Sequence, residues 1–249
     1  MKVIINGAGG AMGKNVQAVV TSGVYDTEAF ALVDKFYKGE LADNQYTSLY
    51  DIKGDADIVI DFSHHSGTAE LLEFCTAKKL PVVIATTGHT DDELELIKKA
   101  SEQTAVFKTT NFSVGVAVLC DLVKKAAAAF PDADVEIIER HHNRKVDAPS
   151  GTALTIAENI QEVRENSKLV MGRSGSSCKR EPGDIGIHAV RYGNEVGTHE
   201  IIISTGYETI TLKHEAEDRK LFADGAVKAA VYLCGKPAGM YGMKELLAE

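Results

Sequence analysis

The sequence contains little of what marks several protein classes. Its four cysteines, Cys75, Cys120, Cys178 and Cys234, stand far apart and form no CxxC pair. This spacing fits neither a zinc ribbon nor a small disulfide scaffold, and it predicts inert thiols in a reducing compartment. The first residues, MKVIINGAGG, lack the apolar run and cleavage site of a signal peptide. No stretch reaches the roughly 18 apolar residues of a membrane span, so we expect a cytoplasmic protein with no membrane partner.

Positive charge is also scarce. The chain has 27 Lys and Arg residues against 36 Asp and Glu residues, and its formal net charge is −9. A nucleic-acid binder usually carries a basic patch, so we expect no nucleic-acid partner. A small anionic ligand would have to be attracted by a local cluster of cations, against the overall field. With 249 residues, of which 44% are hydrophobic, the chain is typical of a globular protein of one or two domains.

The first half of the chain alternates short apolar runs with helical patterns. The apolar runs predict strands at residues 2–6, 29–34, 56–62, 81–87 and 104–110. Helices are predicted up to Ser22, over 68–79, and from a Thr90–Glu93 capping box to about Glu102. Strands that alternate with helices are typical of βαβ units and a parallel sheet.

After Asn111 the pattern changes. Helices are predicted over 113–130 and from Gly151, on either side of a strand at 134–142, and a polar loop follows at 174–184. Period-two alternation over 185–215 predicts an antiparallel meander, before a last helix at 221–235. We therefore expect an α/β fold, with a Rossmann-like doubly wound parallel sheet and a second α+β domain that has a mixed or antiparallel sheet. The expected dinucleotide-binding domain comprises 1–112 and 222–249, and the expected substrate-binding and oligomerisation domain comprises 113–221.

A glycine-rich turn follows the first strand. Gly7, Gly10 and Gly13 form G-x-x-G-x-x-G, a variant of the dinucleotide fingerprint, in which the backbone can approach a pyrophosphate at a helix N-terminus. A tight turn that binds nothing is the alternative. Asp34 ends the second strand, where an acid accepts hydrogen bonds from ribose hydroxyls and favours NADH, while Lys35 could offset its repulsion of a 2′-phosphate. The turns at 85–88 and 109–112 end two further strands and are expected to line the cofactor crevice.

The stretch ERHHNRKVDAPSGTA, residues 139–153, concentrates chemically active groups. A proton donor, His141 or His142, and the ammonium of Lys145 precede a helix that Ser150 can cap. Backbone N–H groups at the start of that helix complete a cationic pocket for a small carboxylate. A solvated strand end is the alternative reading. A zinc site lacks a third or fourth ligand at a useful spacing, so no metal is expected.

HHNRKVDAPSGTA is similar to the signature of the 4-hydroxy-tetrahydrodipicolinate reductase (dihydrodipicolinate reductase) family. GAGGAMG, DFS, ATTG, NFSVGV and FADGAV match that family in the same order, so the resemblance spans nearly the whole chain. It implies an oxidoreductase of lysine (diaminopimelate) biosynthesis. Such an enzyme reduces the cyclic imine dicarboxylate derived from 4-hydroxy-tetrahydrodipicolinate to tetrahydrodipicolinate, with NADH or NADPH. The alternative is another NAD(P)-dependent dehydrogenase that acts on a small carboxylate.

The resemblance also assigns roles to residues. His141 is the implied general acid/base and Lys145 the second proton donor. The implied substrate contacts are His142, Ser150, Gly151 and Thr152. The implied cofactor contacts, together with Lys35, are Gly7, Ala8, Gly9, Gly10, Ala11, Met12, Asp34, Ala85, Thr86, Thr87, Thr109, Thr110, Asn111 and Phe112. Many family members carry a basic residue where this chain has Ala11, and its absence favours NADH. The family also implies a homotetramer built by pairing the sheets of the second domain.

Overall fold

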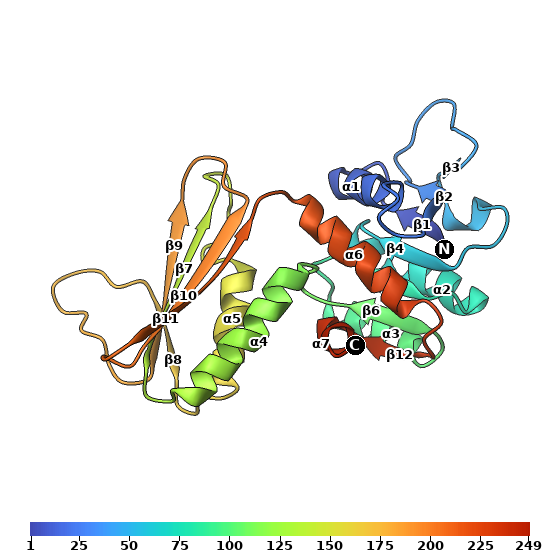
Figure 1. Cartoon of the computed structure of the whole chain (residues 1–249). Coiled ribbons are helices and arrows are strands. Elements are labelled where there is room, and N and C mark those ends of the chain that lie inside the picture. Colours follow the sequence, from blue (N-terminus) through green and yellow to red (C-terminus); the bar gives the residue numbers. More distant parts are fainter. The chain divides into compact units, whose positions relative to one another are not determined.

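A computed structural model describes all residues, 1–249 (Figure 1). The chain divides into two compact units, which are described separately. The first unit combines Met1–Ser113 with Lys220–Glu249, and the second comprises Val114–Arg219. None of the helices is both long enough and apolar enough to cross a membrane.

The first unit contains a seven-stranded sheet in which every neighbouring pair of strands is parallel. The strand order is β12-β6-β5-β4-β1-β2-β3. The strands are β1 (Lys2–Asn6), β2 (Glu28–Val33), β3 (Gln45–Tyr46), β4 (Ile58–Asp61), β5 (Val82–Ile84), β6 (Ala105–Lys108) and β12 (Gly239–Tyr241). The central strands are continuous apolar runs because helices cover both faces of the sheet. The expected Rossmann-like doubly wound sheet is therefore confirmed, while the short β3 and β12 were not anticipated.

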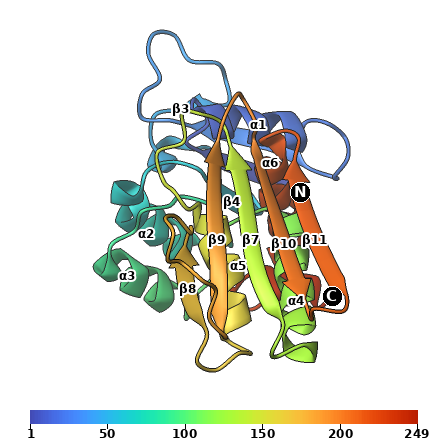
Figure 2. The same ribbon diagram turned by 90° about the vertical axis from the view of Figure 1, so that its left-hand side faces the viewer.

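Helices flank this sheet on its two faces, as Figures 1 and 2 show. The helices α1 (Ala11–Val20) and α6 (Lys220–Leu233) pack together on one face. On the other face, α2 (Thr68–Lys78) and α3 (Asp91–Ser101) pack against each other. Short helical elements complete the unit: η1 (Leu49–Asp51), η2 (His65–Gly67) and α7 (Met243–Leu247). The capping box of α3 is confirmed, because Thr90 Oγ1 accepts from Glu93 N and the Glu93 carboxylate accepts from Thr90 N at 2.8 Å.

The second unit contains a mixed five-stranded sheet in the order β11-β10-β7-β9-β8. Its strands are β7 (Asp134–His141), β8 (Lys168–Met171), β9 (Asp184–Arg191), β10 (Gly197–Ser204) and β11 (Thr209–Ala216). β9 runs parallel to β7 and β8, and β10 runs antiparallel to β7 and β11. The predicted three-stranded meander is wrong, because β7 lies between β9 and β10. Only β10 and β11 form a hairpin, and the connection 192–196 passes over the end of β7.

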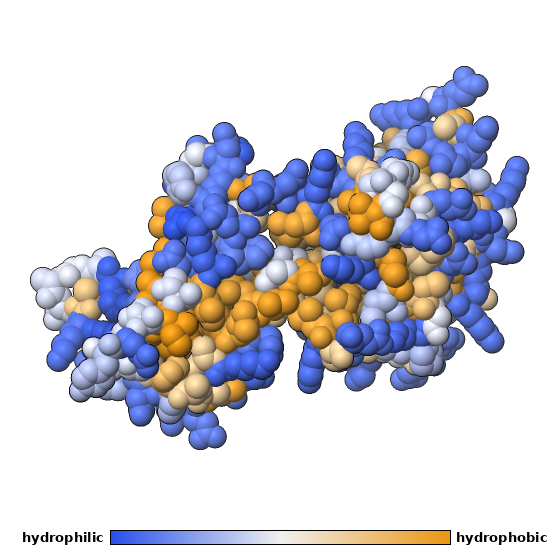
Figure 3. All heavy atoms as spheres, viewed as in Figure 1, coloured by the Kyte–Doolittle hydropathy of each residue, from blue (hydrophilic) through white to orange (hydrophobic).

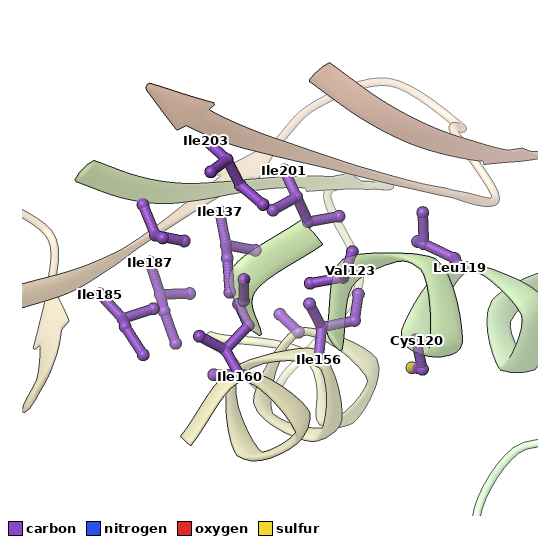
Figure 4. Close-up of a cluster of buried hydrophobic side chains, with 14 of the residues drawn as sticks. Leu119, Cys120, Val123, Ile137, Ile156, Ile160, Ile185, Ile187, Ile201 and Ile203 are labelled. Atoms are coloured by element: carbon purple, nitrogen blue, oxygen red, sulfur yellow. The ribbon is translucent and has the colours of Figure 1, made fainter. Parts of the chain in front are cut away.

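The helices α4 (Val114–Ala129) and α5 (Gly151–Gln161) cover one face of the mixed sheet. Alternate residues of the strands, such as Ile137 on β7 and Ile201 on β10, point toward these helices and are fully buried (Figure 4). The opposite face carries no helix (Figure 2). In the space-filling view of Figure 3, apolar atoms also gather over α4, where Val118 and Leu122 are exposed.

Candidate active site

The strand order of the first unit places a topological switch point at β1 and β4. From β1 the chain proceeds outward to β2 and β3, and then returns to the other side of β1. Ligands of open α/β sheets bind outside the carboxyl ends of the strands at such a point. The glycine turn follows β1, and Asp34 follows β2. The turns at 85–88 and 109–112 follow β5 and β6, so the expected cofactor residues share one edge of the sheet.

The glycine turn is packed too closely for side chains. Gly7 has φ +80°, and a Cβ there would lie 2.5 Å from the carbonyl oxygen of Phe62. A Cβ on Gly13, in the first turn of α1, would lie 2.2 Å from the Gly7 carbonyl oxygen. The N-terminus of α1 has no side-chain cap and no acid in its first turn. Its N–H groups can therefore bind an anion such as a pyrophosphate.

Asp34 lies directly beside this turn. Its Oδ2 accepts a hydrogen bond from Gly9 N at 2.9 Å, and its Oδ1 accepts one from Phe36 N at 2.9 Å. The carboxylate is thus fixed next to the backbone that would hold a dinucleotide. The neighbouring Lys35 directs its ammonium over the Phe36 ring, 5.2 Å from the centroid.

Two of the expected cofactor residues direct their side chains inward. Thr86 is buried, and its hydroxyl donates to the buried carboxylate of Asp61 at 2.6 Å. Burial raises the pKa of Asp61, while hydrogen bonds from Ser63, Thr86 and Asn6 act in the opposite direction. Phe112 is also buried, where its ring packs against Phe107 and Phe62. The side chains of Thr86 and Phe112 thus pack inside the unit, so only the backbone of these two residues can contact a ligand.

In the second unit, the loop that crosses over β7 holds the two histidines. Tyr192 N donates to the His141 carbonyl oxygen at 3.0 Å, and His142 N donates to the Glu195 carbonyl oxygen at 2.8 Å. The meander prediction was therefore wrong at the connection 192–196, which fixes the backbone of both histidines. His141 is 8% exposed and ends the inward-facing row of β7, whereas His142 lies just beyond the strand.

A buried glutamate lies under His141. Glu139 has no exposed surface, and its Oε2 pairs with His141 Nδ1 at 2.6 Å. Both carboxylate oxygens also accept from Arg191, each at 2.7 Å, and Ser150 N donates to Oε1 at 3.0 Å. Burial alone would raise the pKa of Glu139, but the hydrogen bonds from His141, Arg191 and Ser150 N lower it to about 2. Glu139 is therefore ionised at neutral pH.

Lys145 is held by the loop that follows the strand. Its backbone N donates to the His142 carbonyl oxygen at 3.1 Å, and its Nζ pairs with Asp147 Oδ1 at 2.8 Å. The hydrogen bond from Lys145 lowers the pKa of Asp147. Arg191 also donates to the Asp147 carbonyl oxygen at 2.7 Å. A single arginine thus joins the loop that carries Lys145 to the carboxylate beneath His141.

The site is strongly cationic. Burial lowers the pKa of His142, and the charges of Arg144, Arg219, His141 and Lys145 lower it further. Arg144, Arg219 and Lys145 thus place positive charge around one imidazole in a chain whose overall charge is negative. Such a cluster is what a small dianion requires.

Ser150 caps α5 and joins the network. Its Oγ accepts from Ala153 N at 3.2 Å and contacts His199 Nε2 at 2.9 Å. Burial, followed by the charge of His141, lowers the pKa of His199 to about 3, so this imidazole is neutral at the pH where the site works. Gly151 and Thr152 form the first turn of α5. The structure therefore brings together all the expected substrate-site residues on β7, the following loop and the start of α5.

Four residues of this network were not predicted from the sequence: Glu139, Asp147, Arg191 and His199. Glu139 and His199 do leave a signal, because each is a polar residue at an inward-facing position of an otherwise apolar alternation. Arg191 and Asp147 leave none, since each looks like a solvated end of an element. No group of three or more His, Cys, Asp or Glu side chains has the arrangement of a metal site.

This fold, with a Rossmann-type unit and a separate unit that carries a histidine–lysine site, defines a two-domain oxidoreductase. Residues 1–112 match the family model described as dihydrodipicolinate reductase, N-terminus, and residues 115–247 match the one described as dihydrodipicolinate reductase, C-terminus. The chain belongs to the dihydrodipicolinate reductase family, and the resemblance seen in its motifs is confirmed.

Curated relatives and solved structures agree with this assignment. A 4-hydroxy-tetrahydrodipicolinate reductase of Caldanaerobacter subterraneus subsp. tengcongensis is 43% identical over 100% of this chain and 99% of its own length. The Clostridium tetani protein of the same name is 41% identical over 99% of this chain and 97% of its own. The dipicolinate-bound dihydrodipicolinate reductase of Paenisporosarcina sp. TG-14 is 26% identical and covers 98% of each chain, with a TM-score of 0.80. A probable dehydrogenase from Thermotoga maritima, 12% identical over 99% of this chain and 92% of its own, shares the fold with a TM-score of 0.62.

Proposed function

We propose that this chain is a 4-hydroxy-tetrahydrodipicolinate reductase of lysine (diaminopimelate) biosynthesis. It reduces the cyclic imine dicarboxylate derived from 4-hydroxy-tetrahydrodipicolinate to tetrahydrodipicolinate, with NADH or NADPH. The observation that carries this proposal is the convergence of His141, His142, Lys145 and the N-terminus of α5 in one cationic site, in a full-length member of this family. Residues 1–112 and 222–249 serve as the dinucleotide-binding domain, and residues 113–221 bind the substrate.

The substrate carboxylates bind at the start of α5. The backbone N–H groups of Gly151 and Thr152 stand at the positive end of this helix, and Ser150 holds its first turn. His142 and Lys145 supply further positive charge. The solved relative from Paenisporosarcina binds dipicolinate, a planar diacid, which supports a diacid site here.

His141 and Lys145 carry out the proton transfers of the reaction. His141 acts as general acid/base, and Lys145 acts as the second proton donor and neutralises a carboxylate. Lys145 is tied to Asp147 at 2.8 Å, so its ammonium is held at the site rather than free in solvent. A positioned side chain that transfers a proton contributes about 10²- to 10⁴-fold to a rate.

The residues of the first unit fit a dinucleotide. Side chains are excluded at Gly7 and Gly13, where a backbone cradle is needed, and the N-terminus of α1 is uncapped. The residues that would hold the cofactor are 7–12, Asp34, Lys35, 85–87 and 109–112. Reduced nicotinamide, once bound, supplies the hydride.

The cofactor preferred by this chain is NADH. Asp34 stands beside the glycine turn, where a carboxylate accepts from two ribose hydroxyls and repels a 2′-phosphate. Ala11 offers no cation to a 2′-phosphate, and Lys35 is drawn over Phe36. NADPH remains a usable second cofactor because Lys35 adjoins Asp34.

The assay that tests this function follows the loss of reduced-nicotinamide absorbance with freshly generated 4-hydroxy-tetrahydrodipicolinate. NADH and NADPH are compared in parallel, and we expect turnover with both and a higher kcat/KM with NADH. Turnover only with a keto acid or semialdehyde would instead favour the second candidate, another NAD(P)-dependent dehydrogenase of a small carboxylate.

The proposed enzyme works in the cytoplasm as a homotetramer, with no nucleic-acid or membrane partner.

A further inference from the structure

The buried carboxylate of Glu139 has every hydrogen-bonding position filled by a fixed donor. Oε2 faces His141 Nδ1 at 2.6 Å and Arg191 Nη1 at 2.7 Å, while Oε1 faces Arg191 Nη2 at 2.7 Å and Ser150 N at 3.0 Å. These donors come from β7, β9 and the start of α5, so three elements fix the orientation of the carboxylate. An ionised carboxylate only accepts hydrogen bonds, so Nδ1 of His141 must carry the proton.

The opposite side of the His141 ring lies against a glycine. A Cβ on Gly197 of β10 would lie 2.8 Å from His141 Nε2, so any side chain there would press on this atom. The His199 ring meets the His141 ring edge-on, with centroids 5.3 Å apart and planes at 74°. The ionisable groups around His141 are Glu139 on its own strand, Arg191 on β9, His199 on β10, and His142 and Lys145 on the loop.

We infer that Glu139, clamped by Arg191, is the positioning residue that holds His141 with Nδ1–H toward the carboxylate and with Nε2 as the only proton-transferring atom. This inference rests on the proposed function, in which His141 is the general acid/base. When the Nε2–H bond breaks, the proton passes to the substrate and the electron pair stays on Nε2. The Nδ1–H bond remains intact throughout, so the ring needs no change of tautomer between the two halves of the step.

Arg191 has a separate part in this arrangement. Its guanidinium balances the charge of the buried carboxylate, and its two Nη groups fix the orientation of that carboxylate beside the His141 ring. Because Arg191 also binds the Asp147 carbonyl oxygen at 2.7 Å, the same side chain fixes the loop that presents Lys145.

The first test reads the tautomer directly and needs no substrate. In the protein labelled with ¹⁵N-histidine, NMR should show His141 in the Nδ1–H form when neutral, with a low-field Nδ1 proton, and His141→Asn assigns this signal by removing it. In Glu139→Gln, the amide oxygen keeps the Oε1 position, because the backbone N–H of Ser150 there cannot turn away, and the NH₂ group takes the Oε2 position between Arg191 Nη1 and His141 Nδ1. Arg191 Nη1 must move away from this NH₂ group, and the neutral His141 ring must switch to the Nε2–H form so that Nδ1 can accept from it.

The matched control is Glu136→Gln. Glu136 lies on the same strand but on its other face, where it contacts His188 Nε2 at 2.7 Å and Arg173 Nη1 at 2.7 Å. This variant should change the His188 signal and leave that of His141 in place. An Nε2–H tautomer in the unaltered protein, or an unchanged His141 signal in folded Glu139→Gln, overturns the inference.

The second test is kinetic. Glu139→Gln should lower kcat by at least about 10²-fold, the scale seen when a catalytic histidine loses its correct tautomer, with little change in KM. The alkaline side of the rate–pH profile should also move to lower pH, because the uncompensated Arg191 charge disfavours a proton on the ring. Glu139→Asp keeps the charge and should restore the position of the profile, with only part of the loss in kcat. A purely structural role would leave the pH profile where it is, and that result contradicts the inference.

The two tests separate this inference from the proposed function. If Glu139→Gln is poorly folded, the inference is still tested by the pH profile of Glu139→Asp and by the tautomer of His141 in the unaltered protein. If the chain fails to turn over the expected substrate, the NMR result stands by itself. If turnover is normal and the tautomer is Nε2–H, the inference falls and the proposed function survives.

Discussion

At the scale of single residues, Lys145 offers the most direct prediction. Lys145→Ala should lower turnover by about 10²- to 10⁴-fold, because a positioned proton donor and a carboxylate partner are lost together. Steady-state kinetics with the cyclic imine dicarboxylate measures this loss. Lys125→Ala is the control, since Lys125 lies on α4 in an exposed ion pair with Asp121. Equal turnover in the Lys145 variant and the control would remove Lys145 from the mechanism.

His199 yields a prediction about stability and pH. Burial lowers its pKa to about 3 in the folded chain from its ordinary value of 6.5, so the unfolded chain binds the proton more readily. The stability contributed by neutral His199 is therefore fully present above pH 6.5 and is lost as the pH falls toward 3. One proton of difference corresponds to a slope of about 1.4 kcal/mol per pH unit.

Urea unfolding at a series of pH values should show this slope. His199→Gln should flatten the curve between pH 6 and 4 by roughly that amount, whereas the same change at exposed His64 should not. Stability also falls with pH because of Glu139, but at lower pH than for His199. The pKa of Glu139 is lowered from 4.5 to about 2 in the folded chain, so the unfolded chain takes up the proton first. A slope that is unchanged in His199→Gln would show that His199 is not the titrating group.

Single residues also mark how far the sequence could predict the site. His141, His142, Lys145 and the start of α5 lie close together in the chain, so a motif could reveal them. Arg191 reaches Glu139 from 52 residues away along the sequence. Its contribution depends on β9 pairing with β7, and no local pattern encodes that pairing.

At the scale of elements, Arg164 joins the two helices of the second unit. It follows α5 and is buried, and its guanidinium donates to the carbonyl oxygens of Ala127 at 3.1 Å, Ala133 at 2.8 Å and Phe130. These oxygens lie at and just beyond the C-terminus of α4, where carbonyl groups lack partners within the helix. Arg164 therefore caps α4 from its neighbour.

Arg164→Met should lower the free energy of unfolding by about 2–4 kcal/mol, because buried carbonyl groups lose their donors while the side-chain volume is roughly kept. Urea denaturation measures the change. Lys125→Met, at an exposed position of α4, should cost less than about 1 kcal/mol. A cost for Arg164→Met as small as that of the control would mean that water satisfies these carbonyl groups.

The elements also show why the pairing of strands escaped prediction. Period-two alternation located β9, β10 and β11 correctly, because it reports one buried face for each strand. It carries no information about which strand lies beside which. β7 occupies the centre of the sheet, where both of its edges are paired, and its inward-facing Val135 and Ile137 are fully buried.

At the scale of the whole molecule, one face of the mixed sheet has no helix over it. Ile138 on β7 and Ile202 on β10 lie on this face and are half-buried, and Val190 on β9 is 42% exposed. Glu200 and Lys213 face each other across β10 and β11 on the same side. Glu200 also stands opposite Ile138, and Glu136 opposite Ile202, so apolar and charged side chains alternate on this face. An antiparallel or mixed sheet can leave one face to solvent, but a face that combines partly exposed apolar residues with charged ones can also form a subunit interface.

The proposed homotetramer places a second copy of the chain on this face. Light scattering should then give a mass of about four times the 26.8 kDa of one chain. Ile202→Lys should reduce the mass, because the free energy needed to bury an unpaired ammonium in an interface exceeds the binding free energy of the contact there. Val118→Lys, at an exposed apolar position of α4, is the matched control and should keep the full mass. NADH binding to the first unit should persist in both variants, which separates loss of assembly from loss of folding. A single-chain mass for the unaltered protein, or full-sized assemblies of Ile202→Lys, would show that this face is not where the copies meet.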